Sequence, residues 1–98
     1  MNMNEFDALV TVFKAVSHKH RLQILKLLSE SKPLSLEDVA RGVNLNYKTC
    51  SVHVAQMHQA GLVDKMQQSR SVMHRLTPKG KTLMKSIQKL DYRMARLD

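Results

Sequence analysis

The stretch NLNYKTCSVHVAQMHQAGLV, residues 44–63, decides the fold. It is typical of a helix that begins at Asn44 or Asn46, since either side chain can accept a hydrogen bond from a free backbone N–H, and that ends at Gly61. Hydrogen-bonding side chains fill its first half, where a buried helix would carry aliphatic ones, and it contains one lysine and no acidic residue. The front of this helix is therefore predicted to face a partner, and its rear to pack in the core.

The residues before this stretch predict a shorter helix close to it. Ser35, with Asp38 three residues on, resembles a capping box in which aspartate replaces the usual glutamate, and a helix over Leu36–Arg41 follows. Gly42 suits a left-handed C-terminal cap. Residues 35–61 are thus predicted to form a helix–turn–helix.

The residues after the stretch change from helical to alternating hydrophobic spacing. Leu62–Gln67 and Val72–Leu76 are typical of two short strands around the polar tip 68–71. A hairpin of this kind, directly after a helix–turn–helix, is a wing, and we expect it to span residues 62–77.

Helices are also expected at both ends of the chain. Residues 4–17 have hydrophobic side chains at helical spacing, with Asn4 as a plausible N-cap, and Ser17 can cap a second, largely apolar helix. Thr77 can cap a last helix over residues 78–97. The element order predicts a mainly α (α+β) fold, a winged helix–turn–helix in a single domain that covers residues 1–98.

Charge points to a polyanionic partner. The formal net charge is +8, and the span from Lys65 to Lys89 contains basic residues and no acidic one. A solvated surface usually mixes both signs, although a charge that serves only solubility is the alternative. Cys50 is the single cysteine, so no intramolecular disulfide can form. There is no apolar run of membrane-spanning length and no pattern typical of a signal peptide, so we expect a cytoplasmic protein without a membrane partner.

Double-stranded DNA fits the helix–turn–helix best, because the major groove accepts one helix whose front residues reach base edges. We expect Tyr47 and Lys48 to contact bases or phosphates, Ser51 a base edge and Val52 a thymine methyl group. The alternative is a generic solvent-exposed face. His53 is ambiguous, since it could contact a phosphate or cap a neighbouring loop. The predicted DNA-binding residues are Asn46, Tyr47, Lys48, Thr49, Ser51, Val52, His53, Gln56, Arg70 and Arg75.

The two arginines of that set belong to the wing. Arg70 lies at the predicted tip, from which it could reach a phosphate or the minor groove, where narrow grooves attract arginine. Arg75 lies on the return strand and could contact a backbone phosphate. The alternative is that residues 68–70 serve only as turn residues.

The last helix has hydrophobic residues at heptad spacing, with steps of four, three, four and three residues. A domain of this size cannot easily cover both this stripe and the stripe of the first helix, so we expect a homodimer. The alternative is that the last helix folds back on its own domain. The predicted interface residues are Phe6, Leu9, Val10, Phe13, Leu83, Ile87, Leu90, Met94 and Leu97.

Three motifs match a known pattern: Arg-Leu-Gln-Ile-Leu at residues 21–25, Ser51 with His53, and Ala-Gly-Leu-Val at residues 60–63. Over residues 8–77 the chain resembles the ArsR family of small winged-helix repressors, while LTPKGKTL at 76–83 is closer to the MarR family. The resemblance implies a homodimer that binds an operator, often a palindromic site at its own promoter, and usually represses transcription.

The chain departs from the metal-sensing members of that family. Their cysteine motif is absent from SLEDVARG (residues 35–42), and the last helix has Asp91 but no histidine. His18 and His20 do not share one helix face. We therefore expect no metal and no cofactor, and leave the effector open. With no nucleophile–base pair and no phosphate-binding glycine loop, an enzyme is not expected. A winged-helix protein-interaction module and a nonspecific architectural DNA-binding protein remain as alternatives.

Overall fold

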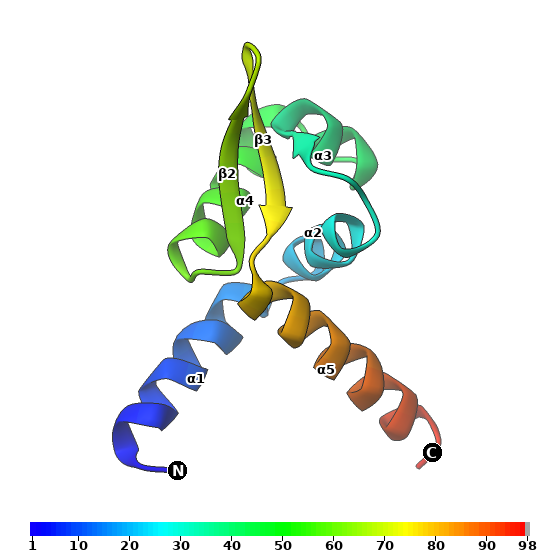
Figure 1. Cartoon of the computed structure of the whole chain (residues 1–98). Coiled ribbons are helices and arrows are strands. Elements are labelled where there is room, and N and C mark those ends of the chain that lie inside the picture. Colours follow the sequence, from blue (N-terminus) through cyan, green and yellow to red (C-terminus); the bar gives the residue numbers. More distant parts are fainter. Residues whose placement is uncertain (98) are drawn as a thin grey trace.

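The computed structural model describes residues 1–97 and shows a mainly helical fold with a small antiparallel sheet (Figure 1). The helix–turn–helix and the wing are both present, which confirms the predicted fold class. The elements in chain order are α1 (Met3–Val16), α2 (Lys19–Ser29), β1 (Leu34–Ser35), α3 (Leu36–Gly42), α4 (Tyr47–Gln59), β2 (Val63–Gln68), β3 (Ser71–Leu76) and α5 (Pro78–Ala95).

The first two helices begin at other residues than predicted. The Asn2 side chain accepts a hydrogen bond from the Glu5 N–H at 2.9 Å, so Asn2 rather than Asn4 caps α1. Because the cap is Asn2, α1 begins at Met3 and is longer at its start than predicted. The N-cap of α2 is His18, whose Nδ1 accepts from the His20 N–H at 3.2 Å. The predicted cap, Ser17, instead ends α1.

Helix α3 has the predicted cap at its start, but the turn that follows it differs from the prediction. Ser35 Oγ accepts from the Asp38 N–H at 3.2 Å, as the capping box predicted. Gly42, however, is part of α3, and the residue with left-handed backbone is Asn44, with φ 57°. Gly42 packs against the end of the Leu27 side chain: a β-carbon there would lie 2.7 Å from Leu27 Cδ2, so this flexible side chain would have to shift.

The sheet has the strand order β1-β3-β2, all antiparallel. Val63 pairs with Leu76 and Gln68 with Ser71, so the predicted hairpin is confirmed with its boundaries shifted by one residue. Ser69, at the tip, has φ 58°. The two-residue strand β1 was not predicted, because it is too short to show an alternating pattern.

The core lies where α2, α3 and α4 pack against the sheet and the ends of α1 and α5. Thr77 caps α5 by accepting from the Gly80 N–H at 3.0 Å, and Pro78 occupies the first turn, as expected. Gly80 packs so closely that a β-carbon there would collide with the Leu62 carbonyl oxygen. The buried hydrophobic residues are Val12, Ala15, Val16, Ile24, Leu25, Leu28, Val39, Ala40, Cys50, Val54, Met57, Leu62, Val63, Leu76 and Met84.

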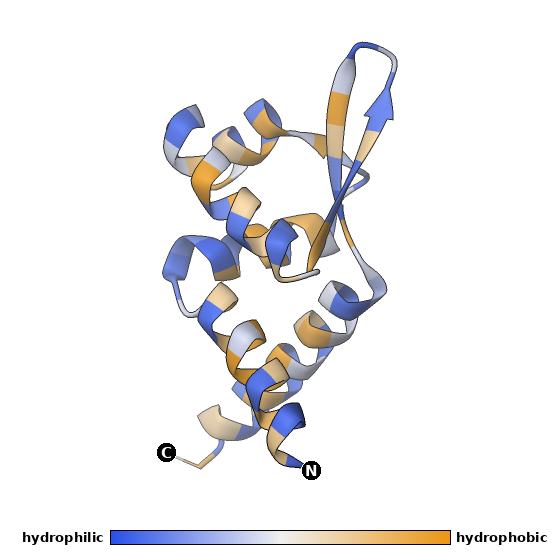
Figure 2. Ribbon diagram, turned by 90° about the vertical axis from the view of Figure 1, so that its left-hand side faces the viewer, coloured by the Kyte–Doolittle hydropathy of each residue, from blue (hydrophilic) through white to orange (hydrophobic). Residues whose placement is uncertain are grey.

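The terminal helices α1 and α5 extend from the body on the side away from the wing tip, and both carry hydrophobic segments along their length (Figures 1 and 2). Two of the predicted interface residues, Leu83 and Ile87, are half-buried against the chain's own core. The other seven are exposed: Phe6, Leu9, Val10, Phe13, Leu90, Met94 and Leu97.

Candidate nucleic-acid interface

Helix α4 has one exposed polar face and one buried apolar face. Its cap is Asn46, whose Oδ1 accepts from the Thr49 N–H at 2.8 Å. Tyr47 and Val52 are 56% and 55% exposed. The remaining predicted contact residues of this face are exposed or half-exposed: Lys48, Thr49, Ser51 and Gln56. The front of the helix is thus open to a partner.

The opposite face of α4 fixes the helix in the core. Cys50, Val54 and Met57 are almost completely buried. Burial raises the pKa of the Cys50 thiol, which disfavours the reactive thiolate. Cys50 is therefore a small packing residue, and the polar front is held on a rigid support.

A cleft of about 500 Å³ separates the start of α4 from the wing. Tyr47 lines it from the helix, and Arg70 and Lys65 line it from the hairpin. The structure thus brings together Tyr47 and Arg70, which are far apart in the sequence. Lys65 was not among the DNA-binding residues predicted from the sequence, although it lies in the basic span without acidic residues, which could have indicated it.

Within residues 1–97, no ion pair involves the basic residues of α4 or of the wing tip. The ion pairs among residues 1–97 are Lys26–Glu30, Arg41–Asp38 and Arg75–Asp64. None of these pairs involves α4 or the wing tip. Lys48 and Arg70 are thus not in an ion pair with any of residues 1–97, and Glu37 is the acidic residue that lines the cleft.

His53 does not belong to the exposed face, which corrects its predicted role. The residue is 8% exposed, and its Nδ1 accepts a hydrogen bond from Arg21 Nε at 3.0 Å. The His18 ring lies 4.4 Å away, centroid to centroid. Burial lowers the pKa of His53, and the charges of His18, Arg21 and His20 lower it further. His53 therefore fastens α4 to the start of α2.

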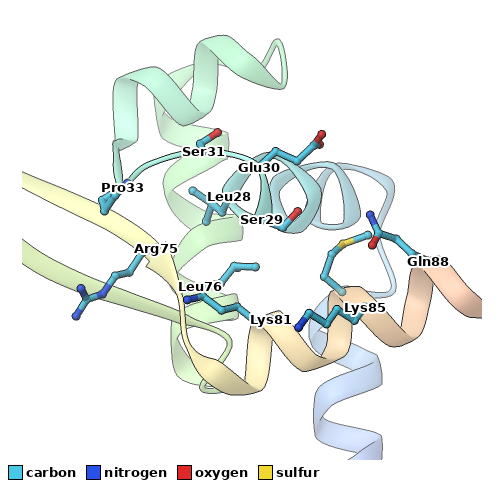
Figure 3. A pocket seen from close by; sticks show the side chains of 11 residues that line it. Leu28, Ser29, Glu30, Ser31, Pro33, Arg75, Leu76, Lys81, Lys85 and Gln88 are labelled. Carbon is cyan, nitrogen blue, oxygen red and sulfur yellow. The ribbon is translucent and has the colours of Figure 1, made fainter.

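Arg75 is also separated from the other predicted DNA-binding residues. Its guanidinium lies 3.5 Å from Asp64 Oδ2, and the side chain borders a different cavity, next to α2 and α5 (Figure 3). The neighbouring residue His74 faces the cleft instead. Side chains of a strand alternate between its faces, so only one of the two can face α4.

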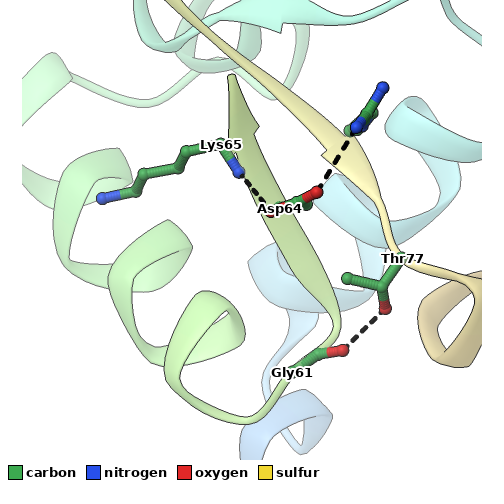
Figure 4. Close-up of polar contacts among 5 residues, drawn as sticks. Gly61, Asp64, Lys65 and Thr77 are labelled. Carbon is green, nitrogen blue, oxygen red and sulfur yellow. Dashed lines mark hydrogen bonds and ion pairs between the residues drawn. The ribbon is translucent and has the colours of Figure 1, made fainter. Parts of the chain in front are cut away.

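The base of the wing is tied to the end of α4 (Figure 4). Thr77 Oγ1 donates to the Gly61 carbonyl at 2.6 Å, and the Thr77 N–H donates to the Leu62 carbonyl at 3.0 Å. Gly61 has φ +79°, which a residue with a side chain rarely adopts. These contacts fix the wing relative to the polar face of α4.

Neither a metal centre nor a membrane span is visible in the part of the chain that is described. Within residues 1–97, no group of three or more His, Cys, Asp or Glu side chains is placed to hold a metal ion. In the same residues, no helix has the length and apolar character needed to cross a membrane.

These features define a winged helix–turn–helix protein, and solved structures support that class. The homodimeric winged helix–turn–helix DNA-binding domain of a possible ArsR-family transcriptional regulator from Mycobacterium bovis matches with a TM-score of 0.87 and 23% identity, over 97% of this chain and 88% of that one. HlyU from Vibrio cholerae matches with a TM-score of 0.79 and 26% identity, over 92% of this chain and 97% of that one.

The sequence comparisons point to one family. Residues 18–65 match the model of the bacterial regulatory proteins of the arsR family. The HTH-type transcriptional regulator YgaV of Escherichia coli is 33% identical over 63 residues, which cover 64% of this chain and 64% of YgaV. Residues 18–65 therefore form a helix–turn–helix region of the ArsR type, as the sequence motifs indicated.

Proposed function

We propose that this protein is a sequence-specific DNA-binding transcriptional regulator that represses from a palindromic operator as a homodimer. The observation that carries the proposal is the exposed, acid-free front of α4 beside the Arg70 wing tip. Net charge of +8 supports it, since phosphate neutralisation supplies much of the affinity of such proteins. The arsR-family match over residues 18–65 supports the same function.

In the proposed complex, the front of α4 enters the major groove. Lys48 contacts a phosphate or a guanine edge, Ser51 and Gln56 hydrogen-bond to base edges, and Val52 contacts a thymine methyl group. The free backbone N–H groups of Tyr47 and Lys48 favour a nearby phosphate, whereas the Thr49 N–H donates to the cap. Asn46 is nearby, but its side-chain oxygen is used by the cap.

The wing supplies the second set of contacts. Arg70 reaches the adjacent minor groove or a phosphate, and Lys65 holds a phosphate beside the cleft. Arg75 takes no part in this set, because it pairs with Asp64 on another side of the wing.

The homodimer is proposed to form through α1 and α5. Their exposed hydrophobic residues lie on the side of the molecule away from the wing tip, so pairing there leaves both recognition helices free (Figure 1). Two copies related by a twofold axis would read half-sites about 34 Å apart on one face of DNA. The M. bovis relative is described as homodimeric, which favours the same arrangement.

Fluorescence anisotropy tests the proposal. DNA from upstream of the protein's own gene is compared with scrambled DNA of equal length, at two salt concentrations. A preference of about a thousandfold is expected, since specific regulators reach at least that ratio. Equal, steeply salt-dependent binding to both would favour an architectural protein, and no binding at low salt would favour a protein-interaction module.

A variant pair assigns the binding to α4. Lys48→Ala combined with Ser51→Ala is expected to weaken specific binding and to leave the dimer intact. Lys89→Ala is the matched control, because it removes the same charge from α5, outside the proposed DNA surface. Unchanged affinity in the double variant would refute the role of the helix front.

A further inference from the structure

A cavity of about 570 Å³ lies between the end of α2, the end of β3 and the first half of α5 (Figure 3). It shares no lining residue with the cleft between α4 and the wing. Its volume is within the range of about 300–1,000 Å³ that small-molecule sites occupy. The cavity is therefore large enough for a small organic molecule and separate from the proposed DNA surface.

The floor of the cavity is apolar and comes from three elements. Leu28 of α2, Leu76 of β3 and Met84 of α5 line it, and all three are more than nine-tenths buried. Methionine is flexible and adapts to the shape of an apolar ligand. This floor suits the hydrocarbon body of a ligand.

The rim of the cavity is positively charged. Lys81 and Lys85 lie one turn apart on α5, and neither pairs with a carboxylate among residues 1–97. Glu30 is the acidic residue of the lining, and Lys26 already pairs with it at 3.4 Å. Arg75 also lines the cavity, but its guanidinium points away from Leu28 and Lys85 (Figure 3) and pairs with Asp64. The two lysines thus lack a counter-charge that an anion could supply.

The two serine hydroxyls of the lining are already engaged. Ser29 Oγ donates to the Lys26 carbonyl at 2.6 Å, and Ser31 Oγ donates to the Leu27 carbonyl at 2.7 Å. Their hydroxyl protons are therefore used within α2. The ammonium groups of Lys81 and Lys85 and the side-chain amide of Gln88 remain as donors available to a ligand.

We propose that this cavity binds a small organic anion, with a carboxylate held by Lys81 and Lys85 and an apolar body on Leu28, Leu76 and Met84. Strand β3 continues directly into α5, so such a ligand contacts the root of the wing and the helix of the proposed dimer interface at once. An effect of the ligand on DNA affinity would rest on the proposed function, whereas binding of the ligand to the cavity does not depend on that function.

Benzoate is the probe for this site, and benzamide, its uncharged analogue of similar shape, is the matched control ligand. In a titration of the full ¹⁵N-labelled chain followed by amide chemical shifts, benzoate is expected to give saturable shifts at Leu28–Ser31, Leu76 and Met84. Benzamide is expected to bind at least about tenfold more weakly, since a charge-assisted contact is lost. Shifts that grow linearly with concentration, or equal binding of the two compounds, would overturn the proposal.

Charge variants locate the anion. Lys81→Gln with Lys85→Gln is expected to weaken benzoate binding at least about tenfold, the change that loss of one charge-assisted hydrogen bond produces. Lys89→Gln, one turn further along α5 and outside the lining, is expected to bind benzoate as the unmodified chain does. An equal loss in both would show nonspecific attraction to α5 and overturn the proposal. All of these lysines are exposed, so the fold is retained, which circular dichroism checks.

The titration contains no DNA, so the two proposals fail independently. Loss of saturable benzoate binding would overturn the cavity assignment and leave DNA recognition by α4 untouched. Absence of specific DNA binding would refute the regulator proposal while the cavity assignment stands.

Discussion

Replacing Asn46 by alanine or by aspartate separates the stability of α4 from its ability to bind DNA. The Asn46 side chain accepts from the Thr49 N–H at 2.8 Å and so satisfies one of the free donors of the first turn. Asn46→Ala removes this acceptor and is expected to lower the free energy of unfolding by about 1 kcal/mol. Asn46→Asp retains the acceptor and adds a negative charge at the positive end of the helix, which is worth about 0.3–1 kcal/mol in its favour.

The same two variants are expected to rank in the opposite order for DNA affinity. An aspartate at the front of α4 would face phosphate groups, and two unit charges about 4 Å apart interact by roughly 1–4 kcal/mol between the dielectric limits of water and a protein surface. We expect Asn46→Asp to weaken specific binding by about tenfold or more, equivalent to roughly 1.4 kcal/mol. Asn46→Ala adds no charge and should bind more tightly than Asn46→Asp, despite being less stable.

Urea unfolding followed by circular dichroism measures the first effect, and fluorescence anisotropy with operator DNA measures the second. Both are done at low salt, where the charge effect is largest. If Asn46→Asp binds operator DNA as tightly as the unmodified protein, the N-terminus of α4 does not face phosphate, and the proposed docking is refuted.

Three further predictions concern pH, packing and assembly. Burial lowers the pKa of His53 below its unfolded value of 6.5. The stability that neutral His53 contributes is therefore complete above pH 6.5 and is lost as the pH falls from 6.5 through the folded pKa. In urea unfolding at a series of pH values, His53→Gln should make this loss of stability smaller. Gly80→Ala forces a β-carbon against the Leu62 carbonyl and should lower the unfolding free energy by about 1–3 kcal/mol, and an unchanged value would contradict the packing. Leu90 is 56% exposed in the single chain, so Leu90→Asp should leave the fold intact and give monomers in sedimentation velocity. Dimers that persist at micromolar concentration would exclude the α5 interface.

Local sequence rules predicted most of the fold because the elements are held by local chemistry. The capping box at Ser35, the cap at Thr77 and the turn at Gly61 each involve residues close in sequence. The cap predicted at Gly42 was misassigned because asparagine also tolerates the left-handed conformation, and Asn44 adopts it two residues later. Strand β1 was not predicted because its two residues are too few to show the alternating hydrophobic pattern of a strand.

The site could be predicted only where helical or strand geometry alone decides which way a residue faces. Tyr47 and Val52 are exposed as expected from the pattern of α4. Arg75 was misplaced because the sequence shows that strand residues alternate but not which alternating set faces α4. The cavity over Met84 was not visible either, since its walls come from segments that only the tertiary fold brings together.

The position of His53 leads to a prediction about Arg21, its half-buried hydrogen-bond partner on α2. Arg21 donates to His53 Nδ1 at 3.0 Å and to the Ala15 carbonyl at 3.4 Å, so it links α1, α2 and α4. Arg21→Ala should lower DNA affinity by about 0.5–2 kcal/mol through the altered placement of α4, without removing a phosphate contact. The slope of log affinity against log salt should therefore stay unchanged, whereas Lys48→Ala should reduce it by about one. A reduced slope in Arg21→Ala would mean that Arg21 contacts DNA itself, and the assignment of a purely internal role would be wrong.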